Sequence, residues 1–555
     1  MNYLSIKFYN LLKKNFFLIF FLIYFFCAII IFDDYGISID EEFHRFSGFY
    51  WLNYIVNILN IESIKNIVSD RLSSINGFTL PNPKDFPFYG VVFDLPLALF
   101  ETILNIQNYK NIFLLRHFFN FLIFFVSSIF FYKILNNRFN NNIIIFFGLL
   151  FYITSPRIFG HSFYNNKDII LLSFLTISIF YYFKTIDNFN FKNILLFSIF
   201  SALACSTRIV ALFIPLSFLL FHLFSLLNRK TNKDQNLKVI LYISFFIFFT
   251  ILTWPFLWSN PIVNFIYAIK VFSDYSMPIE MLFNGNYVYS KLLPIKYIPI
   301  WILISTPILT LIFFILAFFY KLKRFFFRYI NIKAVSIYED FWRGKNEKKD
   351  FYVFFNFLIV FLYLILSGVT LYTGWRQVFF IHFFLVYLST YGIYLFVIFC
   401  KNRKIKLTAY SFIFFLLISN IFDLIKFHPY QSLYFNSILS DRQKNLFEVD
   451  YWGISGLKFL KEVLYLEKNN KDKINIATAA FLPLERSLKL LDTNDSDRIN
   501  IDGQNYENAK YIFDNNISEV NKFLNKKYDI PKNFNKISEF QIDNIVIYKI
   551  YKKSK

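Results

Sequence analysis

Two short segments of the chain bring together acidic and cationic side chains that could move a proton and hold an anion. The first, SIDEEFH, places Asp40, Glu41 and His44 close together. We expect Ser38 to cap a helix that begins near Ile39, which would put Asp40 and His44 on one face, one turn apart. A carboxylate at such a helix start can act as general base for an acceptor hydroxyl or amine. The alternative is an acidic first turn that only complements the helix dipole.

The second segment, SPRIFGHSFYNNKDII, supplies Arg157, His161, Lys167 and Asp168. Asp168 stands where the next apolar run begins, as Asp40 stands near the end of another. Acidic sites flanked by cations suit a substrate that joins a sugar to a phosphate. Arg208 and Arg376 are candidate phosphate ligands because a guanidinium binds phosphate through a bidentate fork. Lys167 would bind it as a point charge.

The composition indicates the environment in which these residues work. The 555 residues are 56% hydrophobic and only 17% charged, against about a quarter charged in soluble domains. The apolar residues form runs of about 15 to 22, the length that crosses a bilayer as a helix. We therefore predict a polytopic α-helical membrane protein. The net charge of +21 comes mainly from alternate short loops, so we expect anionic lipid rather than nucleic acid as its partner.

Hydropathy predicts about eleven transmembrane helices, near 15–32, 112–132, 142–155, 168–183, 193–207, 209–227, 239–257, 298–320, 352–372, 377–399 and 407–425. The stretch 193–227 is too long for one crossing, so we divide it at Arg208. This division also keeps every basic loop on one side of the membrane, as the positive-inside tendency requires.

The basic loops predict a cytoplasmic amino terminus and, with an odd number of spans, an extracytoplasmic carboxyl terminus. Residues 1–427 would form the transmembrane domain, with an outer loop at 33–111. Residues 428–555 would form a small extracytoplasmic (periplasmic) α/β domain. Its β-like runs INIATAA, RINID, AKYIFD and IDNIVIYKIY alternate with helix-like segments at 454–468, 483–491 and 517–526. The protein would lie in the inner (cytoplasmic) membrane, with Asp40, Asp168, Arg208 and Arg376 on its outer face.

The sequence resembles the integral-membrane glycosyltransferases of the GT-C class, specifically family 39, the dolichyl-phosphate-mannose–protein mannosyltransferase-like group, in its bacterial branch. The first outer loop of that family carries an Asp-Glu pair followed shortly by His, as SIDEEFH does here. Further matching segments are YGVVFDLPLALFE, SPRIFGHSFYNNKDI, STRI, LPIKYIPIWILISTP, YTGWRQVFFIH, HPYQSLYFN and FEVDYWGIS. These segments extend from residue 36 to about 455.

The resemblance implies a hexosyl- or pentosyltransferase that takes its sugar from a polyprenyl-phosphate donor, with inversion at the anomeric carbon. Asp40 would be the catalytic base beside Glu41, Asp168 would orient donor or acceptor, and Arg208 would contact the lipid phosphate. No metal or other cofactor is implied. The Asp-Glu-Glu-Phe-His spacing is one residue longer than in eukaryotic members, so the resemblance implies no role for His44. No segment resembles their β-trefoil loop, so the resemblance does not imply a protein acceptor, and the acceptor could be a glycan, a lipid or a protein.

A transporter or flippase of a lipid-linked or anionic substrate is the main alternative, and a catalytically inactive scaffold is another. A transporter would be expected to show interrupted helices, mid-membrane charges and two related halves. Here the acidic residues lie at the membrane edge on one face, and we find no repeated half, which favours an enzyme. The aromatic segments HPYQSLYFN and FEVDYWGIS are expected to pack the carboxyl-terminal domain onto the membrane core rather than to contact substrate.

Overall fold

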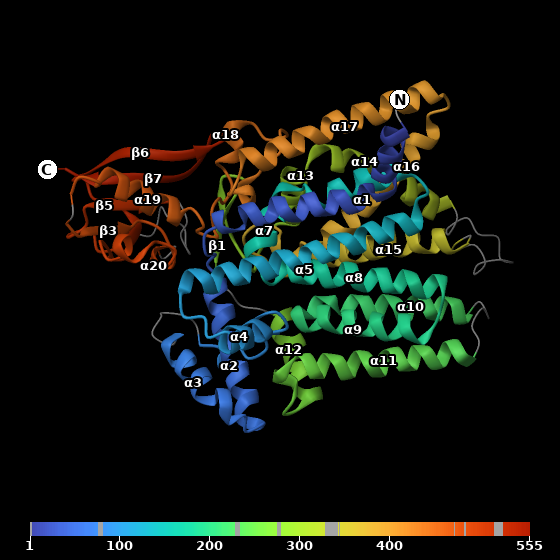
Figure 1. Ribbon diagram of the computed structural model, residues 1–555, viewed down its shortest axis with the longest axis horizontal. Coiled ribbons are helices and arrows are strands. Elements are labelled where there is room, and N and C mark those ends of the chain that lie inside the picture. Colours follow the sequence, from blue (N-terminus) through green and yellow to red (C-terminus); the bar gives the residue numbers. More distant parts are fainter. Residues whose placement is uncertain are drawn as a thin grey trace.

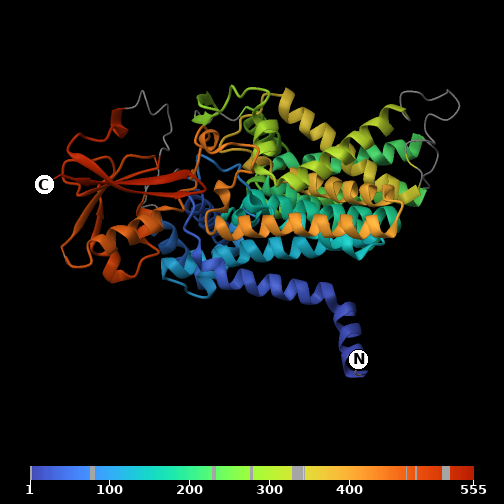
Figure 2. The ribbon, with the colours of Figure 1, turned by 90° about the horizontal axis from the view of Figure 1, so that it is seen from above.

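The protein is a bundle of long, roughly parallel helices with a small sheet domain beyond one end of the bundle (Figure 1). The computed structural model describes residues 3–75, 82–227, 233–274, 279–327, 342, 344–470, 472–481, 484–515 and 526–554. Figure 2 shows the same two parts from above, with the carboxyl-terminal strands set apart from the helices. The prediction of a polytopic helical membrane protein is confirmed.

Eight described helices are long and apolar enough to cross a membrane. They are α1 (Tyr3–Ile31), α5 (Tyr109–Arg138), α8 (Asp168–Asp187), α10 (Phe213–Leu227, preceded by the 3₁₀ turn η2 at Ile209–Leu212), α11 (Lys233–Thr253), α15 (Gly344–Leu366), α16 (Ile381–Phe399) and α17 (Arg403–Lys426). Helices α6 (Asn142–Ile153) and α7 (Pro156–Tyr164), bent by 58° at their junction, make a ninth span if they are taken together.

The other two predicted spans are also helical. Helix α9 (Phe191–Thr207) has 17 residues and ends immediately before Arg208, so the predicted division of 193–227 is confirmed. The predicted span 298–320 is not continuous, because α13 (Tyr297–Ser305) stops before Pro307 and α14 (Ile308–Phe325) follows it. Proline lacks the amide hydrogen that a continuous helix would need at this point.

The predicted outer loop contains a helical layer at the same end of the bundle as the sheet domain (Figure 1). It consists of α2 (Glu41–Ile58), α3 (Glu62–Ile75) and α4 (Asp94–Ile103). Apolar side chains of all three helices form one small core. Glu101 joins them electrostatically, since it accepts from Arg45 at 3.0 Å and from Arg71 at 3.0 Å. The layer thus fixes the direction in which α2 leaves the membrane boundary.

One further helix and a hairpin lie at this end. Helix α12 (Pro261–Ser273) follows the turn after α11, and strands β1 (Glu280–Phe283) and β2 (Asn286–Tyr289) form an antiparallel hairpin. Asn284 and Gly285 both have positive φ, 53° and 81°, as the tight turn of such a hairpin requires. The Asn-Gly pair between two short apolar runs is a sequence signal for this hairpin, although no hairpin is predicted for these residues above.

The carboxyl-terminal domain contains a mixed five-stranded sheet of order β4-β3-β5-β7-β6. Its strands are β3 (Ile474–Thr478), β4 (Ile499–Ile501), β5 (Tyr511–Asp514), β6 (Phe534–Ile542) and β7 (Ile545–Lys553). Strand β3 is parallel to β4 and β5, whereas β7 is antiparallel to β5 and β6. All four β-like runs of the sequence are strands. Strand β6 was missed because most of its side chains are exposed and polar, so it lacks an apolar alternation.

Helices of this domain are α19 (Gly456–Leu466), α20 (Glu485–Leu488) and α21 (Thr493–Ser496). Phe459 of α19 packs against Phe513 and Tyr548 of the sheet, so this helix covers one sheet face. Helix α20 is shorter than the predicted segment 483–491, and the predicted helix at 517–526 lies almost entirely outside the described residues. Between α17 and α19, residues 428–455 return to the helical bundle through the turns η6 (Gln431–Leu433) and α18 (Asp441–Lys444).

Candidate active site

Asp40 lies at the first position of the outer helical layer. Helix α2 begins at Glu41 with Asp40 as its N-cap residue, so the predicted Ser38 cap is wrong. The amide of Ser38 instead donates to Glu41 Oε2 at 2.6 Å. The helix therefore begins two residues later than predicted. The His44 amide donates to Asp40 O at 3.1 Å, as the predicted one-turn relationship requires. The Asp40 carboxylate makes no capping hydrogen bond to α2 and contacts a residue outside this helix.

Glu41 points away from Asp40 and into the protein. Its carboxylate accepts from Ser38 and lies 2.9 Å from Nε2 of His117, a fully buried residue of α5. The two carboxylates of the acidic pair therefore have different surroundings. Glu41 shapes the loop that holds Asp40, whereas the Asp40 side chain is 31% exposed and faces the end of the bundle.

Asp168 begins α8 and is fully buried. Asn165 holds it from two directions, because Asn165 Oδ1 accepts from the Asp168 amide at 3.0 Å and Asn165 Nδ2 donates to Asp168 Oδ2 at 2.9 Å. The same Nδ2 lies 3.0 Å from His161 Nδ1. His161 is itself buried against Phe379 and Trp452. His161 thus helps to orient the Asn165 amide, and Asn165 orients the Asp168 carboxylate.

Arg208 completes this corner of the site from the carboxyl end of α9. Its Nη2 lies 2.6 Å from Asp168 Oδ1, and its side chain is 23% exposed. Its Nε is buried and has no hydrogen-bond partner among the described residues. A guanidinium that is partly exposed and incompletely paired can accept a further anion.

Arg376 connects Asp168 with Asp40. Its Nη1 donates to Asp40 Oδ2 at 2.8 Å and lies 3.9 Å from Asp168 Oδ2. The turn before it contains Thr373 and Gly374, both with positive φ of 57° and 73°, and the Arg376 Nε donates to the Thr373 hydroxyl. Burial alone would lower the pKa of Arg376, but the Asp40 carboxylate raises it above its ordinary value. The side chain therefore stays cationic.

Three aromatic rings surround the Arg376 guanidinium. Its central carbon lies 4.5 Å from the ring centre of Trp452, 4.9 Å from that of Tyr372 and 5.6 Å from that of Tyr451. Tyr451 and Trp452 belong to the FEVDYWGIS segment, which packs on the membrane core as expected and in addition fixes the cation between the two carboxylates. Contact of a guanidinium with aromatic faces is favourable and restricts its orientation.

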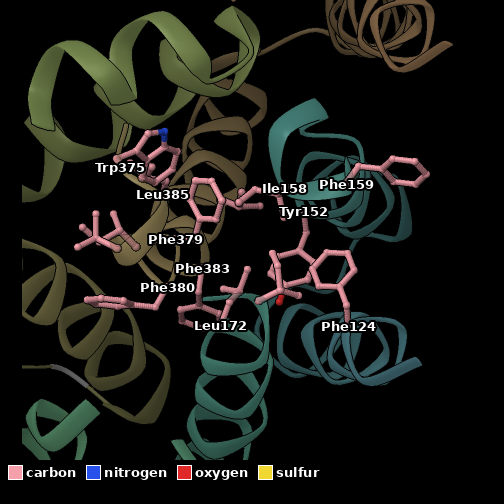
Figure 3. Close-up of a cluster of buried hydrophobic side chains, with 14 of the residues drawn as sticks. Phe124, Tyr152, Ile158, Phe159, Leu172, Trp375, Phe379, Phe380, Phe383 and Leu385 are labelled. Carbon is pink, nitrogen blue, oxygen red and sulfur yellow. The ribbon is translucent and has the colours of Figure 1, made fainter. Parts of the chain in front are cut away.

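Apolar packing beneath this turn supports it. Figure 3 shows Trp375, Phe379, Phe380 and Phe383 in one buried apolar cluster that also contains Tyr152 and Leu172. Trp375 Nε1 also donates to Ser305 Oγ at 2.7 Å, which ties the turn to the break between α13 and α14. A small cavity of about 30 Å³ lies behind Arg376. Burial raises the pKa of Glu448, on its wall, to about 8.

Lys167 and His44 lie beside these groups. Lys167 is paired with other protein groups, and His44 is buried near cations. The Lys167 ammonium donates to the carbonyl oxygen of Gly90 and lies 3.6 Å from Asp94 Oδ2. Asp94 also accepts from Arg116 at 3.1 Å. Burial, together with nearby Lys167 and other cations, lowers the pKa of His44 well below its ordinary value. His44 is therefore neutral at physiological pH.

The structure thus brings together Asp40, Asp168, Arg208 and Arg376, four of the residues predicted from the sequence. Glu41, His161 and Lys167 surround this group and are occupied by protein partners, and His44 lies near its cations. Asn165, Tyr451 and Trp452 were not predicted to contribute. Asn165 had one sequence signal, since an Asn shortly before an apolar run is typical of a helix start. The described residues contain no group of three His, Cys, Asp or Glu side chains placed to hold a metal ion.

Comparison with known proteins bears on this site. The chain is similar to the crystal structure of ArnT from Cupriavidus metallidurans bound to undecaprenyl phosphate, with 8% sequence identity and a TM-score of 0.44 over 97% of this chain and 98% of that one. A comparison with individually curated proteins gave no match. The family model described as dolichyl-phosphate-mannose-protein mannosyltransferase matches residues 98–254. The matched segment contains Asp168 and Arg208, and over it the predicted resemblance to the dolichyl-phosphate-mannose–protein mannosyltransferase-like group is confirmed.

Proposed function

We propose that this protein transfers a sugar from a polyprenyl-phosphate-linked donor to an acceptor at the outer face of the cytoplasmic membrane. The observation that carries the proposal is the meeting of Asp40, Asp168, Arg208 and Arg376 at one end of the helix bundle. An amphipathic donor of this kind would keep its chain in the bilayer and its phosphate at the membrane edge, where these residues lie.

Asp40 is proposed as the general base because its carboxylate is partly exposed whereas that of Asp168 is fully buried. It would accept the proton of an acceptor hydroxyl or amine as that atom bonds to the anomeric carbon. The bond from the anomeric carbon to the phosphate oxygen breaks in the same step, and the lipid phosphate leaves with the electron pair. One such displacement inverts the anomeric centre.

Arg208 is proposed to bind the donor phosphate, with Asp168 holding its guanidinium in place. Charge on the leaving phosphate grows during the displacement, so a fixed guanidinium stabilises the transition state more than the ground state. Arg376 is proposed to align Asp40 with Asp168, and Lys167 to add to the positive potential of the site. Glu41, His44 and His161 are proposed to shape its walls.

No metal or other cofactor is proposed, because the cations of the chain can stabilise the leaving phosphate. Acceptors of three kinds fit the proposal: a glycan, a lipid or a protein. Transfer of a hexose and transfer of a pentose are both compatible with the site. The amino terminus is proposed to be cytoplasmic and the 428–555 region extracytoplasmic, as the distribution of basic loops predicts.

The test is sugar release or transfer from a radiolabelled polyprenyl-phosphate sugar by the purified chain in lipid nanodiscs. Asp40→Asn should lower the rate by about 100-fold or more, the usual effect of losing an acid–base group. Asp168→Asn should lower it by about 100-fold as well, because it removes the charge that holds the Arg208 guanidinium in place. Asp274→Asn is the matched control, since Asp274 is a highly exposed carboxylate of the predicted outer face. Wild-type rates in both site variants would overturn the site assignment. Transport of intact donor across proteoliposomes without transfer would instead support the transporter alternative.

A further inference from the structure

The carboxyl-terminal domain holds the outer helix that carries Asp40. Arg486 of α20 donates from Nε to Glu42 Oε2 at 2.8 Å, and the ammonium of Lys489, which follows α20, donates to Glu42 Oε1. The Glu42 side chain is only 8% exposed. Removing one partner from a buried ion pair leaves an uncompensated buried charge, so separating the domain from Glu42 is energetically unfavourable.

Residues 428–455 also hold the segment that carries Asp40, through backbone contacts. The Ile39 amide donates to the carbonyl oxygen of Trp452 at 3.1 Å. Gly36 lies so close to Ile454 that a Cβ at this position would be 2.7 Å from the Ile454 carbonyl oxygen. Only glycine fits there, because that distance is shorter than a carbon–oxygen contact allows. Residues 36–42 are therefore anchored by chain that follows the last transmembrane helix.

Asp40 lies between these anchors. Ile39 precedes it and Glu42 follows two residues later, while its own carboxylate pairs with Arg376. Two of the rings around Arg376, those of Tyr451 and Trp452, also come from the 428–455 segment. Chain beyond the membrane helices thus contacts Arg376 directly and contacts residues on both sides of Asp40.

We propose that the carboxyl-terminal domain positions Asp40, with Glu42 as the positioning residue that Arg486 and Lys489 hold. This inference rests on the proposed function, in which Asp40 is the base. Glu42 itself contacts no reacting atom, because both of its oxygens are occupied by the domain. Its effect would pass through the first turn of α2 to the Asp40 carboxylate.

Three variants of the full chain test this inference: Glu42→Gln, Arg486→Gln with Lys489→Gln, and all three changes together. Each should lower kcat about 10-fold and leave the KM for the lipid-phosphate sugar within about twofold, because Arg208 is untouched. The combined variant should be no slower than either parent, since it removes both sides of one contact. Glu485→Gln changes an exposed carboxylate of α20, the helix that carries Arg486, and should behave as wild type.

A second measurement needs no substrate. Amide hydrogen exchange in residues 36–44 should rise about 10-fold in Glu42→Gln and in the double variant, while exchange in α5 stays unchanged. Unchanged exchange and kcat, or losses that multiply in the combined variant, would overturn the inference. Faster exchange with wild-type kcat would also overturn it, since the domain would then dock without positioning the base. If exchange responds but even the wild-type chain transfers no sugar, the proposed function fails while the docking contact stands.

Discussion

Asp40 and Asp168 meet at one nitrogen atom, Arg376 Nη1, which lies 2.8 Å from an oxygen of the first and 3.9 Å from an oxygen of the second. The three residues come from the outer loop, the start of α8 and the turn before α16. A buried and a half-buried carboxylate that both lie within 4 Å of one nitrogen atom would repel each other if that nitrogen carried no positive charge. Arg376 therefore makes the pair possible and sets its geometry.

Arg376→Lys is expected to lower kcat/KM by about 100-fold, and Arg376→Ala by at least as much. A lysine ammonium lacks the planar fork and cannot lie flat between Tyr372 and Trp452 while it reaches both carboxylates. Steady-state transfer assays measure the effect. Arg442→Lys, at an exposed position of α18, is the control and should retain full activity. Near-normal activity of Arg376→Lys would show that a point charge is enough.

The sequence predicted a shared outer face for segments that the structure places at one end of the helix bundle, because basic loops and apolar runs are local signals. It also singled out Asp40, Asp168, Arg208 and Arg376 by type and by family resemblance. It did not predict that Glu41 turns toward His117, since that depends on packing between α2 and α5. Nor could it pair Glu42 with Arg486, two residues from opposite ends of the chain. Contacts between distant segments leave no trace in local periodicity.

Arg208→Gln is expected to raise the KM for the lipid-phosphate sugar by about 10-fold or more, with a further loss in kcat. Glutamine keeps a hydrogen-bond donor but removes the charge that Asp168 holds at 2.6 Å and that would face the phosphate. Kinetics over a range of donor concentrations in nanodiscs separate the two effects. Lys291→Gln, which removes a cation of the predicted outer face, should leave both constants unchanged. A normal KM in Arg208→Gln would place the phosphate elsewhere.

Asn165 offers a test of how Asp168 is oriented. Asn165→Ala removes the donor to Asp168 Oδ2 and is expected to lower kcat by about 10-fold. Asn165→Asp keeps the shape but places a second carboxylate within hydrogen-bond distance, so one of the two must take up a proton. Its transfer rate should be the lower of the two near neutral pH and should rise as the pH increases. Equal, pH-independent rates for both variants would argue against electrostatic control of Asp168.

Removal of divalent ions tests whether the cations of the chain suffice. Transfer by the wild-type chain should stay within about twofold after treatment with EDTA, because Arg208 and Arg376 can offset the charge of the leaving phosphate. Inhibition by EDTA that Mg²⁺ or Mn²⁺ reverses would contradict this expectation. Treatment with EDTA already saturated with Mg²⁺ is the control for effects of the chelator on the membrane.

The contact between Glu42 and the carboxyl-terminal domain should depend on pH in a defined direction. Burial would raise the pKa of Glu42, but Lys489 and Arg486 together lower it below its ordinary value of 4.5. A carboxyl whose pKa is lowered by docking binds fewer protons when docked. Its contribution to docking is therefore fully present above about pH 4.5 and is lost as the pH falls through the lowered value.

Amide exchange in residues 36–44, corrected for the intrinsic pH dependence of exchange, should thus be constant from about pH 7 to pH 5 and rise below about pH 4.5. Glu42→Gln should show fast exchange throughout with no such step, because glutamine does not titrate in this range. The exposed-site control Glu485→Gln should follow the wild-type curve. A step of equal size in Glu42→Gln would assign the pH dependence to another carboxyl group of the domain contact.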